Sequence, residues 1–398
     1  MHSADQSVVM ILEATFPVYG GGGAESQVLT LGKCLHSRGV RVGVVVPMVP
    51  GGRQIERELI DNLDVSRIPY PKVRLLGGLM MLTKLAALLF FRRSQYSFIH
   101  AHIASNMAAV SALMGALLGK PVLIKLTGLK EMVGGILDPN PGLAARIRKW
   151  AMRGATFQAT SARIRQLLLD SGFDASQVIQ LPNGVDVNRF IRVGRDATLR
   201  RELCGSASLV GVFVGRLAPE KGHETLFEAW ANAFAHDANV KLVLVGDGPQ
   251  RRALHVLAEK LGIAEQVVFA GHTDNVAKFL GIADFGLLTS LVEGLSNSLL
   301  EYMASGLAVV GSRVSGTEDF VIRGETGWLF EPGEAAALAS ALVSVGATDI
   351  ADLREMGDRA QRLIILKASL EAVTSELMSL YKFEIVSSSN VLSNTAAS

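Results

Sequence analysis

The chain has 398 residues, which favours two domains over one, and 49% of them are hydrophobic, enough for a large core. Its 39 Lys and Arg residues nearly balance 37 Asp and Glu residues, whereas a nucleic-acid-binding protein would show a basic excess or stripe. Cys34 and Cys204 lie far apart in the sequence and in no Cys/His cluster with ligand spacing, so neither a disulfide scaffold nor a structural zinc site is supported. No secretory signal is visible at the N-terminus, and we expect a cytoplasmic protein.

The first half of the chain alternates between apolar runs and helical patterns. Residues 8–12 form a continuous apolar run, 24–37 place apolar residues on one helix face, and 41–46 are apolar again. This order predicts a βαβ unit with parallel strands. Further strands are expected at 96–102, 121–128, 155–160 and 178–181, and further helices at 106–118 and 144–152.

Four glycines at 20–23 precede the first expected helix. Such a loop lets the backbone approach an anion and present its N–H groups. The spacing fails the G-x-G-x-x-G fingerprint, so a dinucleotide-binding loop is not indicated. A flexible glycine loop without a ligand is the alternative interpretation.

Residues 75–91 are strongly apolar but fall short of the roughly 20 residues that a membrane span needs, and they contain Lys84. Arg74, Arg92 and Arg93 flank the segment. A helix that lies in a membrane interface has this composition. A core or interdomain helix has it as well, so both interpretations stay open.

The strand at 96–102 ends in two histidines. Alternation along a strand places His100 and His102 on the same face of the sheet. A histidine at a strand's carboxyl end could contact a substrate, and a structural histidine is an equally good interpretation.

The domain boundary is expected after Pro182-Asn-Gly-Val-Asp186, a sequence with turn-forming residues. We assign residues 1–188 to the first domain and 189–365 to the second, where the alternation of strands and helices restarts. A helix at 368–382, within a segment 366–385, is expected to pack back on the first domain, and residues 386–398 form a polar tail that we expect to be disordered. The strands of the second domain are expected at 210–214, 241–245, 267–270, 285–289 and 308–311, and its helices at 224–235, 250–261, 276–282, 298–305 and 317–322.

Two cations follow the buried strand 210–214 on a single loop. Arginine can bond phosphate oxygens in a fork, and lysine supplies a point charge. Arg216 and Lys221 could therefore neutralise a departing diphosphate without a metal ion. The chain has no Asp-x-Asp pair of the kind that holds a divalent ion on a sugar nucleotide. An ordinary surface loop is the alternative.

Two carboxylates, Glu293 and Glu301, follow the strand at 285–289, one on a loop and one a turn into the next helix. Loops and helix N-termini at strand ends are where open α/β sheets bind ligands, and the positive helix end favours a diphosphate. Ionised carboxylates beside that anion could accept hydrogen bonds from sugar and ribose hydroxyls. Alternatively, Ser298 and Glu301 form a capping box, and Glu293 is a solvated acid.

The combination resembles the retaining glycosyltransferases of family 4. The motifs occur in the family's order over residues 8–382: the glycine loop 20–23, Pro182-Asn-Gly-Val-Asp186, residues 215–222, Val245-Gly-Asp-Gly-Pro249, the Glu293/Glu301 pair and Thr326-Gly-Trp-Leu-Phe330. The resemblance implies the GT-B fold, in which two Rossmann-like, doubly wound parallel-sheet α/β domains face a central cleft.

The family's functional residues map onto positions in this chain. The resemblance implies that Arg216 and Lys221 hold the donor diphosphate, that Glu301 accepts from the ribose and Glu293 from the donor sugar, and that the backbone of Gly294, Leu295 and Ser296 contacts sugar and phosphate. It also implies that Gly22 and Gly23 close on the diphosphate and that His102 takes part in catalysis. No metal or other cofactor is expected.

The implied reaction is the transfer of a hexose from a nucleotide-sugar, UDP by family habit, to a hydroxyl of a glycan or lipid-linked acceptor, with retained configuration. Cell-surface polysaccharide or glycolipid synthesis is the expected setting, with peripheral contact to the inner membrane face through residues 74–93. Thr127 stands where relatives often have a histidine. A protein that binds sugar nucleotides without transferring the sugar is therefore an alternative, and an epimerase or oxidoreductase is a more distant one.

Overall fold

The computed structural model describes residues 6–17, 23–49, 52–71, 73, 76–128, 131, 134–191, 196–235 and 237–383. Within them the chain divides into two compact units. The first unit contains the described residues up to Gly184 and resumes at Leu370, and the second unit runs from Val185 to Ser369. The expected tail at 386–398 and Gly22 lie outside the described residues.

The first unit is built on a sheet with the strand order β3-β4-β2-β1-β5-β6-β7-β8, parallel except for β3 against β4. Its elements are β1 (Ser7–Ile11), α1 (Gly23–Ser37), β2 (Arg41–Pro47), β3 (Arg57–Ile60), β4 (Leu63–Ile68), α2 (Leu76–Phe91), β5 (Phe98–Ala101), α3 (Asn106–Leu118), β6 (Val122–Leu126), α5 (Leu143–Ala151), β7 (Thr156–Ala159), α6 (Ala162–Asp170), β8 (Val178–Gln180) and α15 (Leu370–Tyr381).

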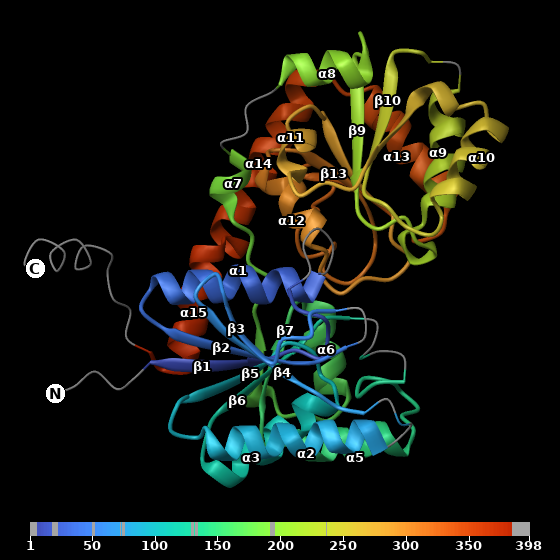
Figure 1. The fold of residues 1–398 in the computed structure, drawn as a ribbon. Coiled ribbons are helices and arrows are strands. Elements are labelled where there is room, and N and C mark those ends of the chain that lie inside the picture. Colours follow the sequence, from blue (N-terminus) through green and yellow to red (C-terminus); the bar gives the residue numbers. More distant parts are fainter. Residues whose placement is uncertain are drawn as a thin grey trace, which may run out of the picture. The chain divides into compact units, whose positions relative to one another are not determined.

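Helices cover both faces of this sheet. Figure 1 shows α2, α3 and α5 on one face, while α1 and α15 cover the other. Strands buried on both faces are apolar at nearly every position, which explains the almost continuous apolar runs in β1 and in β6, where Lys125 is the exception. The last helix is held to the sheet by a polar contact as well, because the Tyr381 hydroxyl lies 2.6 Å from Nδ1 of His100.

The second unit has a parallel sheet with the strand order β11-β10-β9-β12-β13-β14. The chain adds strands outward from β9 to β11 and then returns to place β12 on the other side of β9, which is the arrangement of a Rossmann fold. Its elements are α7 (Val187–Ile191), α8 (Ala197–Cys204), β9 (Leu209–Val214), α9 (His223–Phe234), β10 (Val240–Val245), α10 (Arg251–Lys260), β11 (Val267–Gly271), α11 (Val276–Leu280), β12 (Phe285–Leu288), α12 (Asn297–Ala304), β13 (Ala308–Ser312), β14 (Gly327–Phe330), α13 (Ala335–Gly346) and α14 (Ile350–Ala368).

The expected pair of doubly wound, largely parallel α/β domains is confirmed, with local corrections. Residues 317–322 are turns and not a helix, because Gly316 has φ +81° and turns the backbone against Gly294. The helix expected at 368–382 is α15, Leu370–Tyr381, and the extended Ser369, with a ψ of 145°, separates it from α14. The β3–β4 hairpin and the helices α6, α7, α8, α13 and α14 were not anticipated.

In the described part of the chain, no single helix has both the length and the apolar composition of a membrane span. Taken together, α13 and α14 have both, although the pair is bent by 113°.

Candidate active site

The second unit brings two loops together at the point where its strand order reverses. β9 and β12 are neighbours in the sheet, and each leads at its carboxyl end into a loop and a helix, α9 and α12. The two helices pack into different core clusters on opposite faces of the sheet, and ligands bind at such a reversal point in open α/β sheets. The loop after β9 carries Arg216 and Lys221, and the loop after β12 carries Glu293.

Lys221 and Glu293 form an ion pair across this strand junction. The Ser290 hydroxyl also donates to the Glu293 carboxylate at 3.1 Å, and the Thr289 hydroxyl donates to the backbone carbonyl of Lys221 at 2.9 Å. The Lys221 and Glu293 side chains remain 22% and 18% exposed. The pair is thus held by its surroundings and still open to a ligand.

Arg216 lies on the same loop as Lys221 but does not join that pair. Its guanidinium pairs with Glu220, four residues along the chain, and its side chain is 65% exposed. An exposed pair of this kind contributes only about 0–1 kcal/mol. Arg216 is therefore free to turn toward an anion at little energetic cost.

The capping box that the sequence allowed at the start of α12 does not form. The N-cap residue is Ser296, and Ser298 lies inside the helix with its hydroxyl donating to the carbonyl of Val214 at 2.8 Å. Ser298 is used to fasten α12 to the end of β9. Gly294, Leu295 and Ser296 are buried in the connecting loop, so a ligand would meet mainly their backbone.

Glu301 lies one turn into α12 and is partly buried. Within the described residues its carboxylate has no hydrogen-bond partner. Burial raises the pKa of Glu301 to about 7, and the positive charge of Arg189 opposes that shift. Arg189 itself donates to the carbonyl of Asp274, in the loop after β11, at 2.7 Å. Glu301 therefore offers an unused acceptor close to neutral pH.

Tyr302 on α12 bridges β9 and β12 at the strand junction. It was not singled out from the sequence. Its hydroxyl accepts from the Val214 N–H at 2.6 Å and donates to the Leu287 carbonyl at 3.2 Å. The ring lies where a side chain on Gly286 would be, since a Cβ there would come within 2.6 Å of it. A glycine inside a strand often marks such a close approach and was the available signal.

The comparisons with known proteins agree with this geometry. The profile of the family "Glycosyl transferases group 1" matches residues 208–347, and that of "Glycosyltransferase Family 4" matches residues 21–189. The 2-deoxystreptamine N-acetyl-D-glucosaminyltransferase of Streptomyces fradiae is 30% identical over 348 residues, which cover 80% of this chain and 81% of that protein. The chain belongs to glycosyltransferase family 4.

A further relative and a solved structure are similar to this chain, and the structure shows the fold of nearly the whole chain. The N-acetyl-alpha-D-glucosaminyl L-malate synthase of Bacillus anthracis is 27% identical over 292 residues, 73% of this chain and 75% of that protein. The structure of Anabaena HepE in complex with UDP superposes with a TM-score of 0.76 at 20% identity, covering 94% of this chain and 99% of HepE. The glycosyltransferase therefore has the GT-B fold that the motifs implied.

Of the site residues that were expected in the first unit of this glycosyltransferase and are described, Gly23 is exposed and His102 is buried. Gly23 is the first residue of α1. His102 follows β5 and is buried, with its ring stacked on His100 at 4.0 Å and no hydrogen-bond partner for either ring nitrogen among the described residues. Burial, then His100 and Lys125, hold the pKa of His102 well below its ordinary value. His102 is therefore neutral at pH 7.

Thr127 is occupied by contacts within the first unit. The carboxylate of Glu131 accepts from the Thr127 hydroxyl at 3.3 Å and from the Gly128 N–H at 3.0 Å. Lys125, two residues earlier on β6, is buried with no described partner, and burial lowers its pKa to about 7. The loop that carries a histidine in many relatives is thus fixed here by an internal carboxylate.

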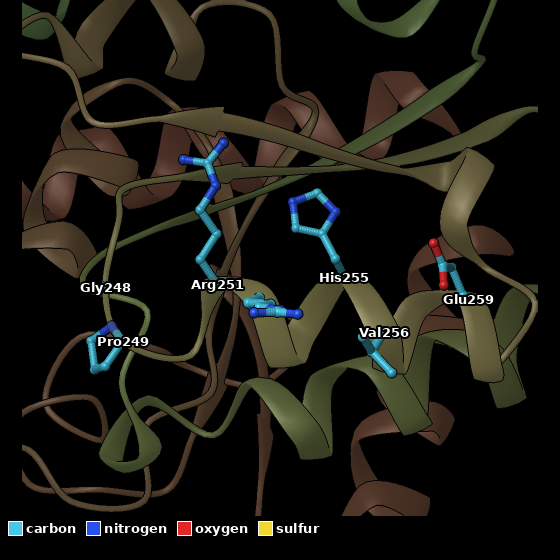
Figure 2. A pocket seen from close by; sticks show the side chains of 7 residues that line it. Gly248, Pro249, Arg251, His255, Val256 and Glu259 are labelled. Atoms are coloured by element: carbon cyan, nitrogen blue, oxygen red, sulfur yellow. The ribbon is translucent and has the colours of Figure 1, made fainter.

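A shallow hollow in the second unit borders the loop after β9, because its lining residue Gly248 lies against the backbone of Leu217. Figure 2 shows its lining on α10 and the loop before it, where the side chains of Arg251, His255 and Glu259 stand along one helix face. Its lining residues include none of the expected site residues. Among the described residues, no three His, Cys, Asp or Glu side chains are placed to share a metal ion.

Proposed function

We propose that this glycosyltransferase moves a hexose from a UDP-sugar to a hydroxyl acceptor and retains the anomeric configuration. Lys221 and Arg216 would bind the donor diphosphate, and Glu301 would accept hydrogen bonds from the ribose hydroxyls. Glu293 would accept from hydroxyls of the donor sugar, and the backbone of residues 294–296 would line the sugar and phosphate.

The observation that carries the proposal is the ion pair between Lys221 and Glu293 across the β9–β12 junction. A diphosphate beside Lys221 and a sugar beside Glu293 satisfy both charges with matched partners. Glu301, whose carboxylate is unpaired among the described residues, is available for a third set of hydroxyls. The three groups together match the three parts of a nucleotide-sugar.

The choice of UDP is supported by a structural neighbour. The Anabaena HepE structures are titled as complexes with UDP and with UDP-glucose. The relatives from Streptomyces fradiae and Bacillus anthracis are named for the transfer of an N-acetylglucosaminyl group. A UDP-hexose or UDP-N-acetylhexosamine is accordingly the donor class that we propose.

Retention follows if the acceptor attacks the face that the diphosphate leaves. The bond from the anomeric carbon to the phosphate oxygen breaks, the bond to the acceptor oxygen forms, and the acceptor proton passes to the departing phosphate oxygen. This route needs no protein base, which is consistent with the buried His102, because burial lowers its pKa and makes it a weak proton acceptor. We propose that Lys221 and Arg216 stabilise the departing charge in place of a metal ion.

The acceptor that we propose is a glycan or lipid-linked hydroxyl at the cytoplasmic face of a membrane. Support for this comes from the apolar helix surface described in the next subsection. The proposed acceptor and the proposed donor are tested by separate experiments.

The test uses the full-length protein with UDP and a panel of UDP-sugars. The correct nucleotide at about 100 times its Kd should stabilise the protein by about 2.7 kcal/mol in thermal unfolding. A competent donor should also release UDP when acceptor is present, and NMR of the product should show the donor's anomeric configuration. Lys221→Met should lower the rate of transfer by about 10²–10³-fold.

Lys260→Met, which removes an exposed lysine on α10, is the matched control and should leave transfer unchanged. Stabilisation by no nucleotide would contradict the donor site. A nucleotide that stabilises the wild type and Lys221→Met equally, without sugar transfer to any acceptor, would instead restore the interpretation as a binding protein.

A further inference from the structure

Three neighbouring helices of the first unit expose an unusual amount of apolar surface. α3 packs against both α2 and α5, and Figure 1 shows the three helices as one layer on the same face of the sheet. Ten large apolar side chains on this layer are exposed, which is nearly half of those exposed in the described chain: Leu76, Leu79, Met80, Phe90, Phe91, Leu113, Leu117, Leu143, Ile147 and Trp150. We name this surface the α2–α3–α5 face.

The sequence left open whether residues 75–91 form a core helix or an interfacial helix, and the structure shows features of both. α2 buries Met81, Leu85 and Leu89 against the sheet. Phe91 on the same helix is 76% exposed, and on α5 Trp150 is 60% exposed. Exposed apolar surface on several adjacent elements marks an interaction site in a soluble domain.

The charged side chains on α2, α3 and α5 have a single sign. The three helices contain no Asp or Glu. Their cations are Lys84, Arg146, Arg148 and Lys149, and Arg92, Arg93 and Arg153 follow the helix ends. No described carboxylate forms an ion pair with any of these seven cations. The apolar surface is therefore bordered by uncompensated positive charge.

We propose that the α2–α3–α5 face docks on an anionic lipid bilayer. Apolar side chains would enter the headgroup boundary, Trp150 would lie at the interface, and the cations would face lipid phosphates. A second copy of the chain is a poorer occupant. A two-fold dimer would bring this face against itself and place the same uncompensated cations opposite one another.

The test measures flotation of the full-length protein with vesicles of phosphatidylcholine alone and with about 30% phosphatidylglycerol. The protein should float with the anionic vesicles at low salt and be released at high salt, because the charge contribution is screened. Arg146→Gln with Arg153→Gln should weaken partitioning about 30-fold, since each cation contributes about 1 kcal/mol. Ile147→Asn with Trp150→Asn should abolish it.

Leu366→Asn, at a 74% exposed position on α14 in the second unit, is the matched control and should float as the wild type does. Circular dichroism and thermal unfolding show whether each variant is folded. Equal flotation on neutral and anionic vesicles, no flotation at all, or no effect of the α5 substitutions in folded protein would overturn the proposal. A dimer in sedimentation analysis that the Ile147/Trp150 substitutions dissociate would assign the face to a second copy instead.

Discussion

The hydroxyl of Tyr302 on α12 accepts a hydrogen bond from the N–H of Val214, the last residue of β9, at 2.6 Å. β9 pairs with β12 only as far as Phe213, so the side chain supplies a partner that the sheet does not. Glu301 precedes Tyr302 and Arg216 follows Val214 by two residues. One buried hydroxyl thus links the backbone of β9 and β12, the two strands whose loops carry the proposed donor site.

Tyr302→Phe should therefore reduce both stability and donor affinity. Loss of the partner leaves the Val214 N–H buried and unsatisfied, which costs about 1–3 kcal/mol. Tyr96→Phe is the control, because Tyr96 is also buried and donates to the Leu89 carbonyl at 2.8 Å, but in the first unit. Both variants should lose stability in denaturant unfolding, and only Tyr302→Phe should weaken UDP-glucose binding by calorimetry. An unchanged affinity of Tyr302→Phe for UDP-glucose would show that this hydroxyl does not support donor binding.

Glu301→Gln should change the pH dependence of stability and of donor binding. The folded pKa of about 7 lies above the ordinary value of 4.5, so the stability that this carboxyl contributes in its protonated form is present below pH 4.5 and is lost as the pH rises through 7. The glutamine variant avoids that loss. Its free energy of unfolding should equal that of the wild type at pH 5 and should exceed it at pH 8 by at most about 2–3 kcal/mol, as measured by thermal unfolding.

Donor binding should show the opposite preference, because only the ionised carboxylate accepts from two hydroxyls. Wild-type affinity for UDP-glucose, whose esterified diphosphate does not titrate near neutrality, should rise from pH 6 to pH 8. The Glu301→Gln variant should bind more weakly with a flat pH profile. A parallel rise in both proteins would show that another group is responsible.

Gly222 and Gly262 allow backbone strain to be separated from steric conflict. Both have a left-handed φ, +68° and +70°. A Cβ on Gly262 meets nothing within 4 Å, whereas one on Gly222 would lie 2.2 Å from the Thr289 carbonyl oxygen. Gly262→Ala should cost about 1–2 kcal/mol, and Gly222→Ala about 1–3 kcal/mol more.

Gly222→Ala should also slow transfer, since the displaced residues include Lys221 and the loop after β12. Denaturant unfolding and UDP release measure the two effects. Equal destabilisation by the two alanines would mean that the loops after β9 and β12 move apart freely.

Lys125→Met should stabilise the protein at neutral pH. The folded pKa of Lys125, about 7, lies below its ordinary value of 10.5, so between these values the unfolded chain holds a proton that the folded chain has released. The stability associated with Lys125 is thus present above pH 10.5 and falls toward pH 7. The methionine variant should be more stable than the wild type at pH 7, and the difference in their free energies of unfolding should shrink toward pH 10. Lys260→Met should show no such trend, and a constant difference for Lys125→Met would contradict this account.

The sequence predicted the strands and loops around the β9–β12 junction well because these elements are regular. Buried parallel strands such as β9 and β12 are continuous apolar runs, and the polar residues of the site follow directly at their ends. The order of the motifs then placed Lys221 and Glu293 on loops that the structure brings into contact. Local periodicity and motif spacing were sufficient for that result.

Other features depend on tertiary contacts that a local pattern does not contain. Ser298 has the spacing of a capping box, but the nearby Val214 carbonyl takes its hydroxyl. β3 is a partly exposed edge strand with the sequence Arg-Glu-Leu-Ile, so it has no apolar run to indicate it. His102 stacks on His100, which in turn contacts Tyr381 of α15, a helix remote in sequence from β5.

The return of α15 to the first unit has a consequence for biosynthesis. During translation β1 is synthesised more than 350 residues before α15, the helix that covers it. Val373, Leu377 and Tyr381 of α15 complete the core that Val8 and Met10 of β1 begin. The continuous second unit can finish folding while the first still exposes that apolar surface. The nascent first unit therefore leaves this apolar surface uncovered until α15 has been synthesised.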